Sequence, residues 1–452
     1  MNSINENPLG YEKISKLLKG FAFPSITATL VSSLYNIVDQ IFIGQGVGYL
    51  GNAATNVSYP LSTICLAIAL LIGIGSSSRF SICLGRKDTK QAGKIVGNGI
   101  LLMTFMGILY LILGEMFLTP LLNIFGSTRE VLPYARQYAG IVLLGMPFLI
   151  LTNGICALIR ADGSPRYSMI CMASGAVVNT ILDPVFIFVF HWGIFGAALA
   201  TILGQILSFI IAIRYLWRFQ TIKLSRECFQ IDVGDCLRTC YAGISSSVNQ
   251  LAITAVQVVL NNSLTYYGTL SSYGEDIPLA ACGIVMKTNA ILLSIIIGLS
   301  QGVQPIIGYN FGARKYDRVK QAYRLAIQWN LVVSAIGFIL FQFFPRPIIS
   351  LFGSGEPLYF EFAVLFMRTF LFMVAVNGIQ LLSSNFFTAI GKAMKGLLLS
   401  LTRQVFFLIP LILILPLRFG IFGVLLAAPV ADFAAFVVSA ALVRREFGRL
   451  KI

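Results

Sequence analysis

Charged side chains inside long apolar runs are the residues of this sequence that could do chemistry. Asp39 lies near the end of an apolar run that starts near Phe21, in the stretch YNIVDQIFIGQGVG (35–48). A carboxylate at the centre of a bilayer costs roughly 2.5–3.5 kcal/mol on insertion scales, so such residues usually face a protein interior or a watery cavity. The other charged residues deep inside such runs are Asp183, Lys287, Arg368, Arg403 and Asp432.

Two carboxylates, an amide and a hydroxyl are predicted to meet in the first half of the chain. Asp183 lies nine residues before Trp192 and Thr201 nine residues after it, so a hairpin turning there places both at equal depth. Asn179 is one helical turn from Asp183 on the same face. Asp39 precedes the glycines that end its own run by five to seven residues, which is roughly 8–10 Å at the rise of a helix.

These oxygen-bearing groups suit a proton shared by a carboxylate pair or a hard monovalent cation such as Na⁺. Beyond a possible Na⁺ at Asp39, Asn179, Asp183 and Thr201, no metal site is expected, and no cofactor other than a coupling H⁺ or Na⁺. Pro184 removes a backbone N–H and leaves the carbonyl of Thr180 without its usual partner. The alternative is that the two aspartates are hydrogen-bonded structural residues, although no positive residue lies near their depth in this half.

The second half of the chain carries a different set of polar residues. Arg403 and Asp432 lie 15 and 14 residues on either side of Arg418, so a structural ion pair between adjacent helices is predicted. Gln257 is a candidate for lining a cavity, with a hydrogen bond between helices as the equal alternative. Lys287 has no carboxylate partner in the sequence pattern, so it either answers an anionic group or extends to a membrane interface.

Composition sets the fold class. The chain has 452 residues, of which 57% are hydrophobic and 11% charged. Apolar runs of roughly 20 residues are long enough for helices to span a bilayer. We therefore predict an all-α polytopic membrane protein with twelve transmembrane helices, at about 21–44, 53–77, 95–118, 134–157, 168–190, 193–215, 241–264, 278–303, 325–344, 361–388, 396–416 and 420–442.

The net charge of +15 is distributed as in a membrane protein and gives no reason to expect nucleic-acid binding. Most lysines and arginines fall in the N-terminal tail and in every second loop, whereas the remaining loops hold only Arg129, Arg346 and Arg418. By the positive-inside rule both termini are cytoplasmic, and the expected location is the plasma (inner) membrane.

An internal repeat divides the chain into two halves. Four short matches share an offset of 227 residues, including GIFG at 193–196 and again at 420–423. Each half then holds six spans, which gives two six-helix lobes related by a parallel internal repeat. The expected division is an N-terminal lobe (1–215), a cytoplasmic linker (216–240) and a C-terminal lobe (241–452).

The stretches LYNIVDQIFIGQGVG, RADGSPRYSM, NTILDPVFIF and GLSQGVQPIIGYNFGARKYDRVKQA together resemble the multidrug and toxic compound extrusion (MATE) family. The resemblance covers essentially the whole chain. It implies two six-helix bundles that form a V-shaped antiporter and export organic, often cationic, drugs in exchange for H⁺ or Na⁺.

Carried over by position, the resemblance also implies residue roles. Asp39, Asn179, Asp183 and Thr201 correspond to the cation site, and Pro24 to a proline at which the first span bends. Tyr35, Asn36, Tyr138 and Asn153 correspond to polar positions in or beside the first-lobe cavity. One branch of the family has acidic cation ligands in spans seven and ten, and here no buried acid lies in those spans.

Several other functions are weighed against a drug exporter. A lipid-linked saccharide flippase of the same wider superfamily is the main alternative, but a large anionic substrate would require several cations in the cavity. An enzyme would need a nucleophile, histidine or metal-binding set, and eight scattered cysteines with one histidine do not provide one. A channel is disfavoured by the duplicated plan with its buried acid pair. The expected partners are small organic substrates and the lipid bilayer, with the monomer as the functional unit.

Overall fold

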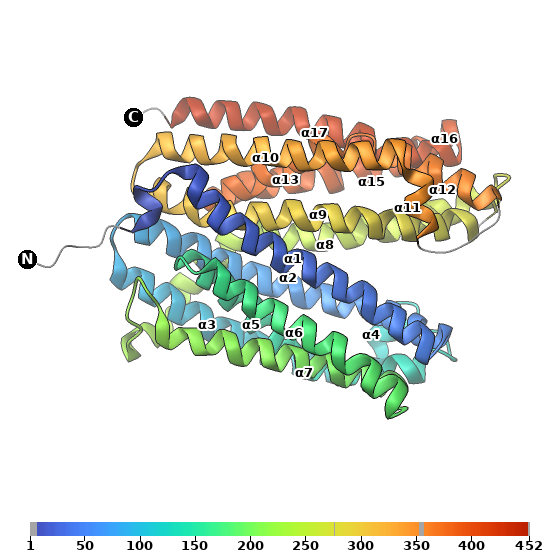
Figure 1. Ribbon diagram of the computed structural model, residues 1–452, viewed down its shortest axis with the longest axis horizontal. Helices are drawn as coiled ribbons and strands as arrows, with labels where there is room; N and C mark the ends of the chain where they lie inside the picture. The colour runs from blue at the N-terminus through green and yellow to red at the C-terminus, as the bar shows by residue number, and fades with distance from the viewer. Residues whose placement is uncertain (1–6, 275, 352–356, 451–452) are drawn as a thin grey trace, which may run out of the picture.

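The computed structural model describes residues 7–274, 276–351 and 357–450, and helices account for nearly all of that part of the chain. The predicted all-α class is confirmed. The long helices run along the long axis of the molecule, and both termini lie at one end (Figure 1). We call this end the terminal end. The first half contains α1 (Ile14–Gly46), α2 (Tyr49–Gly85), α3 (Thr89–Met116), α4 (Leu118–Ile124), α5 (Leu132–Ala161), α6 (Pro165–Pro184) and α7 (Gly193–Arg214).

The second half repeats this plan with more interruptions. It contains α8 (Val233–Thr269), α9 (Asp276–Gly312), α10 (Tyr316–Phe343), α11 (Pro345–Ser350), α12 (Pro357–Phe370), α13 (Val374–Ala389), α14 (Ala393–Leu401), α15 (Ile409–Ile414), α16 (Pro416–Phe419) and α17 (Ile421–Arg449). Eleven described helices are long and apolar enough to cross a membrane, and the bent pair α12 and α13 makes twelve. The predicted number of spans is therefore consistent with the structure.

Three spans are not the continuous helices that the sequence predicts. The span expected at 361–388 is broken, because α12 and α13 meet at an angle of 49°. The span expected at 396–416 is interrupted by a π-helical turn, Thr402–Leu408. A second π-helical turn, Val185–Val189, follows Pro184, which cannot donate a backbone hydrogen bond. Such turns are common where a helix carries a functional residue.

The internal repeat is visible in the backbone itself. Gly193 and Gly420, which are 227 residues apart, have φ values of 55° and 57°. Lys87 and Arg314 have the same offset and φ values of 63° and 59°, although non-glycine residues rarely adopt positive φ. Equivalent turns in the two halves therefore share one uncommon conformation, which confirms the parallel duplication.

The two lobes meet through a symmetric helix contact near the terminal end. A Cβ added to Gly85 of α2 would lie 2.0 Å from the carbonyl oxygen of Tyr309 on α9. A Cβ added to Gly312 of α9 would lie 2.1 Å from the carbonyl oxygen of Ile82 on α2. Both pairs have the offset of 227, so each lobe makes the contact that the other makes, as across a two-fold axis. Only glycine permits this close approach of the two backbones.

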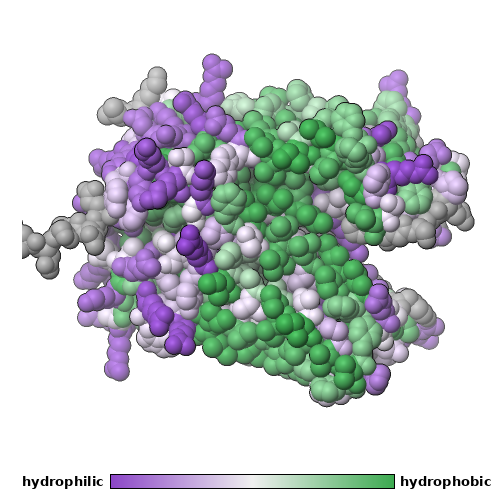
Figure 2. All heavy atoms as spheres, in the orientation of Figure 1, coloured by the Kyte–Doolittle hydropathy of each residue, from purple (hydrophilic) through white to green (hydrophobic). Residues whose placement is uncertain are grey.

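An ion pair adds to the closure at this end. Arg79 of α2 donates to the Asp235 carboxylate of α8 at 2.7 Å, and also to the Thr239 hydroxyl at 2.8 Å. At the other end of the molecule the lobes separate, and Figure 2 shows a hollow between them. The structure is therefore closed at the terminal end and open at the opposite end.

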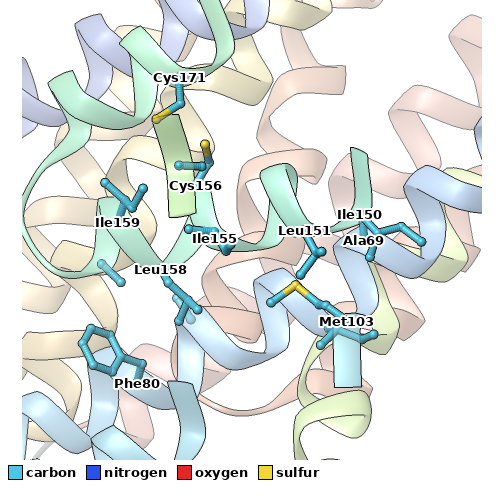
Figure 3. Close-up of a cluster of buried hydrophobic side chains, with 14 of the residues drawn as sticks. Ala69, Phe80, Met103, Ile150, Leu151, Ile155, Cys156, Leu158, Ile159 and Cys171 are labelled. Atoms are coloured by element: carbon cyan, nitrogen blue, oxygen red, sulfur yellow. The ribbon is translucent and has the colours of Figure 1, made fainter. Parts of the chain in front are cut away.

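Each lobe has a close-packed interior. In the first lobe, Ile150, Leu151, Ile155 and Leu158 of α5 belong to the same buried cluster as Phe80 of α2 (Figure 3). That cluster continues into the second half through residues of α9 and α13, whereas a second cluster lies wholly within the second half. On the face drawn in Figure 2, apolar side chains cover the helices between the two polar ends, as expected for a bundle in lipid.

Candidate functional site

Three helices of the first lobe bring the predicted cation-site residues together. Asn179 and Asp183 lie on α6, Thr201 on α7 and Asp39 on α1. The Asn179 side-chain nitrogen donates to Asp183 Oδ1 and to Thr201 Oγ1, both at 3.3 Å. The carboxyl groups of Asp39 and Asp183 lie within hydrogen-bonding reach of each other. The depth inferred from the hairpin spacing therefore places all four groups in one site.

The oxygen atoms of this site fit a proton or a small cation. Asp39 Oδ1, Asp183 Oδ2 and Asn179 Oδ1 are buried and have no hydrogen-bond partner among the described residues. Ionised carboxylates only accept hydrogen bonds, so two facing carboxylates need a positive group between them or a proton on one of them. None of the ion pairs in the described part of the chain involves Asp39 or Asp183. These carboxylate and amide oxygens are therefore suited to bind H⁺ or Na⁺.

An apolar cluster closes the site on the side away from the terminal end. It consists of Ile43, Ile187 and Ala197, which are all buried. Each lies four residues, or one helical turn, further from the terminal end than Asp39, Asp183 and Thr201 respectively. The same three helices thus build a polar layer and then an apolar layer above it. This apolar layer separates the carboxylate pair from the part of the lobe furthest from the terminal end.

Two tyrosines lie close to the carboxylate pair. Tyr35 and Tyr138 are half-buried and interact electrostatically with both aspartates. Tyr138 also lies close to Thr201. Asp39 itself is half-buried, whereas Asp183 is completely buried. Within the pair, Asp39 is therefore the more exposed carboxylate.

The other predicted cavity residues lie apart from this site. Asn36 is exposed and its amide donates to the Ser32 carbonyl of its own helix at 2.7 Å. In the second lobe, the Gln257 amide donates to Asn261 Oδ1 at 2.8 Å. Lys287 is exposed on α9.

α1 runs through Pro24 as one helix, in which the proline ring leaves the Gly20 carbonyl without its intrahelical donor.

Sequence reasoning misses Arg160, which the predicted spans place among the basic residues of a loop. Arg160 is only 5% exposed, and its guanidinium donates to the Ser168 hydroxyl at 3.0 Å. It lines a small cavity of about 30 Å³ together with Asn153 and with Gln301 of the second lobe. The cause of the error is the length of α5, which continues to Ala161.

Arg403 and Asp432 form a buried ion pair in the second lobe. Arg403 Nε lies 2.5 Å from Asp432 Oδ1, and both side chains are largely shielded from solvent. Arg403 belongs to the π-helical turn Thr402–Leu408, and Asp432 belongs to α17. The pair therefore ties an irregular span to its neighbour, which is a structural role.

We expect Arg403→Ala and Asp432→Ala each to lower stability strongly, because the remaining buried charge costs about 3–5 kcal/mol. Thermal melting of the detergent-purified protein is the measurement. Exchanging the two residues should recover part of the loss. Arg418→Ala, which removes an exposed arginine from the same hairpin, is the matched control. A single variant as stable as wild type would show that the pair contributes nothing.

The architecture and the site define a class of protein. A duplicated bundle of membrane helices, open between its lobes at one end and holding a buried carboxylate pair, is typical of a secondary transporter. The family model MatE matches residues 24–185 and 247–414, so it matches each half once. The chain belongs to the MatE family, and it is a multi-pass membrane protein.

Relatives of known description are transporters. Over 93% of this chain and 92% of its own length, the FAD transporter of Shewanella oneidensis is 27% identical. The multidrug export protein MepA of Staphylococcus haemolyticus is 27% identical over 93% of this chain and 91% of its own length. A solved MATE family multidrug resistance transporter of the MOP superfamily, in an outward-facing conformation, superposes with a TM-score of 0.92 at 21% identity, with complete coverage of both chains.

Proposed function

We propose that this protein is an antiporter that exports organic, usually cationic, compounds in exchange for H⁺ or Na⁺. The observation that carries the proposal is the facing pair Asp39 and Asp183, with three buried carboxylate and amide oxygens that lack a partner. The description of MepA as a multidrug export protein supports the same substrate class. The basic residues around the termini support a cytoplasmic orientation of both ends, and we propose the plasma (inner) membrane as the location.

The mechanism follows from competition at the carboxylate pair. Asp39 and Asp183 attract a cationic substrate while both are ionised, and they lose this attraction when a proton or Na⁺ occupies the pair. Substrate and coupling cation therefore weaken each other's binding by the same factor, as linkage requires. When a neutral substrate is exchanged for one cation, one elementary charge crosses the membrane, and 100 mV then releases about 2.3 kcal/mol, which corresponds to roughly fifty-fold accumulation. When a singly charged cation is exchanged for one H⁺ or Na⁺, no net charge moves, and the concentration gradient of the coupling cation drives export.

The structure also suggests how α1 takes part. Asp39 lies on α1, and α1 packs against α9 of the second lobe as well as against α6. Neutralising Asp39 lowers the free-energy cost of burying its side chain. The equilibrium between different conformations of α1 therefore changes when a cation binds. Pro24 is the place where α1 can bend, because one intrahelical hydrogen bond is already missing there. Cation binding in the first lobe is thereby connected to the interface between the lobes.

The test is transport by the full chain in proteoliposomes loaded with a fluorescent organic cation such as ethidium. A pH gradient and a Na⁺ gradient are imposed separately, each at zero membrane potential and then with a potential. Efflux that depends on at least one gradient, and that disappears when the gradient is collapsed, is the expected result. Efflux at the same rate without either gradient would contradict antiport.

A second substrate class is favoured by one observation. Arg160 is buried beside the cavity that Asn153 and Gln301 also line, and no carboxylate of the described residues pairs with it. A buried guanidinium is suited to an anionic group, and the Shewanella relative is described as an FAD transporter. The cavity of about 30 Å³ is far too small for a dinucleotide in this conformation, so organic cations remain our first proposal. Inhibition of ethidium efflux by FAD in the same proteoliposomes distinguishes the two.

A further inference from the structure

A basic pocket lies at the terminal end, between the start of α3 and the segment that joins the two lobes. Its volume is about 260 Å³. Thr89, Lys90 and Lys94 contribute from the first two turns of α3, and Lys223, Ser225 and Cys228 from the joining segment. This segment, residues 219–232, is the lime-green hook at the terminal end of Figure 1, and we call it the lobe linker.

The lobe linker is held tightly against α3, so the pocket has a fixed wall. A Cβ added to Gly97 would lie 2.0 Å from the Cys228 carbonyl oxygen, and one added to Gly93 would lie 2.8 Å from the Cys228 sulfur. The backbone N–H of Asp232 donates to Asn98 Oδ1 at 2.8 Å. Gly93 and Gly97, one helical turn apart, therefore allow the linker to pack directly against α3. Asn98 holds it there by a hydrogen bond.

The chemistry of the pocket is that of an oxyanion site. Lys90, Lys94 and Lys223 supply three ammonium groups, and Glu227 is the one acidic residue of the lining. None of the three lysines takes part in an ion pair among the described residues. The hydroxyl groups of Thr89 and Ser225 are further donors. Lysines bind phosphate as point charges, so a phosphate group is the ligand that this lining fits.

The surroundings of the pocket favour a lipid phosphate over a free one. The linker continues from Cys228 into exposed apolar residues, with Ile231 72% and Val233 68% exposed. Trp217, just before the linker, is 80% exposed. The apolar span of α3 begins at Ile95, immediately after Lys94. Lysines above an apolar surface with an exposed tryptophan are typical of the headgroup level of a membrane.

We propose that this pocket binds the phosphate headgroup of an anionic phospholipid from the leaflet at the terminal end. The acyl chains then lie along the apolar start of α3, and the headgroup joins α3 to the lobe linker. This site is separate from the carboxylate pair, and the proposal stands whether or not the protein couples export to H⁺ or Na⁺.

The site is well placed to influence the relative movement of the lobes. The lobe linker ends at Asp232, whose side chain accepts from the Asp235 N–H at the start of α8. The Asp235 carboxylate in turn accepts from Arg79 of α2 at 2.7 Å and from Gln91 of α3 at 2.9 Å. A headgroup that fixes the linker on α3 therefore stabilises the closed arrangement of α2, α3 and α8.

The test is native mass spectrometry of the full chain in detergent, titrated with phosphatidylglycerol and, separately, with phosphatidylcholine. Wild type should retain one phosphatidylglycerol in preference to phosphatidylcholine. The triple variant Lys90→Gln, Lys94→Gln, Lys223→Gln should bind it at least ten-fold more weakly. The control triple variant Lys13→Gln, Lys19→Gln, Lys87→Gln removes the same charge from exposed positions outside the pocket and should stay within two-fold of wild type.

Three outcomes would overturn the proposal. Equal binding of phosphatidylglycerol by wild type and the pocket variant would place the lipid elsewhere. An equal loss in both triple variants would show general charge attraction instead of a site. Displacement of the lipid by 10 mM inorganic phosphate, with no preference between the two lipids, would make free phosphate the ligand and would refute the lipid assignment. Circular dichroism of both variants confirms that they are folded, so that each outcome refers to binding.

Discussion

Asp39→Asn is expected to reduce cation-coupled efflux to the background of empty liposomes while the protein still inserts and melts close to the wild-type temperature. The amide preserves the shape of the side chain but cannot take up and release a proton, and it attracts Na⁺ weakly. Asp183→Asn should have the same effect, because the two carboxyl groups face each other. Glu130→Gln, which removes an exposed carboxylate at the opposite end from the termini, is the matched control.

Binding measurements separate loss of coupling from loss of substrate binding. Substrate affinity is measured from pH 5 to pH 9, with and without Na⁺, in wild type and in both variants. In wild type the affinity for an organic cation should weaken as protons or Na⁺ are added, because they compete for the same pair. The dependence should flatten in both variants. A cation dependence that survives both substitutions would place the coupling site elsewhere, most directly in the second lobe.

The candidate site can be predicted from the sequence because its geometry depends on local regularities. A tight hairpin between two helices makes equal sequence distances into equal depths, so the sequence places Asp183 and Thr201 correctly relative to each other. A carboxylate inside an apolar run has few explanations, so Asp39 stands out from the sequence pattern alone. The same hairpin argument predicts the Arg403 and Asp432 pair, and the structure brings these two residues together.

Other features of the fold depend on contacts that one sequence does not specify. The break between α12 and α13 has no proline or glycine at Leu371–Met373 to announce it, so local sequence rules predict one span. The burial of Arg160 depends on how far α5 extends before the chain turns. The apolar layer of Ile43, Ile187 and Ala197 is recognisable only once α1, α6 and α7 are placed side by side, although each residue lies one turn from a predicted site residue.

Gly85 and Gly312 stand out in the sequence, but their structural role cannot be predicted from it. Gly85 and Gly312 are paired in the sequence by the repeat offset of 227, and this pairing indicates duplication. Their role as the contact between the lobes depends on which helices meet, which the offset does not specify. Because the contact is symmetric, equivalent substitutions on α2 and on α9 should have similar effects on the closed state. Comparing the two substitutions therefore tests the symmetry of the repeat.

Gly85→Ala and Gly312→Ala are each expected to open the terminal end and to stop transport. Each new Cβ would lie about 2 Å from a backbone carbonyl oxygen of the other helix, which cannot move without moving that helix. Overpacking of this kind costs about 1–3 kcal/mol, which lowers the ratio of closed to open states roughly 5- to 150-fold. Alanine also raises the intrinsic stability of each helix, by about 1 kcal/mol relative to glycine, so a weakened helix cannot explain the effect.

The opening is measured by electron spin resonance as the distance between spin labels at Lys87→Cys and Arg314→Cys, in a background with the native cysteines replaced. These exposed positions lie two residues beyond the ends of α2 and α9 and are related by the repeat. Both alanine variants should increase the mean distance between the labels and broaden the distance distribution. The two effects should be alike because the contact is two-fold. Gly20→Ala is the control, since a Cβ there meets nothing within 4 Å. An unchanged distance and full transport in either variant would mean that the closed contact between α2 and α9 is not part of the working cycle.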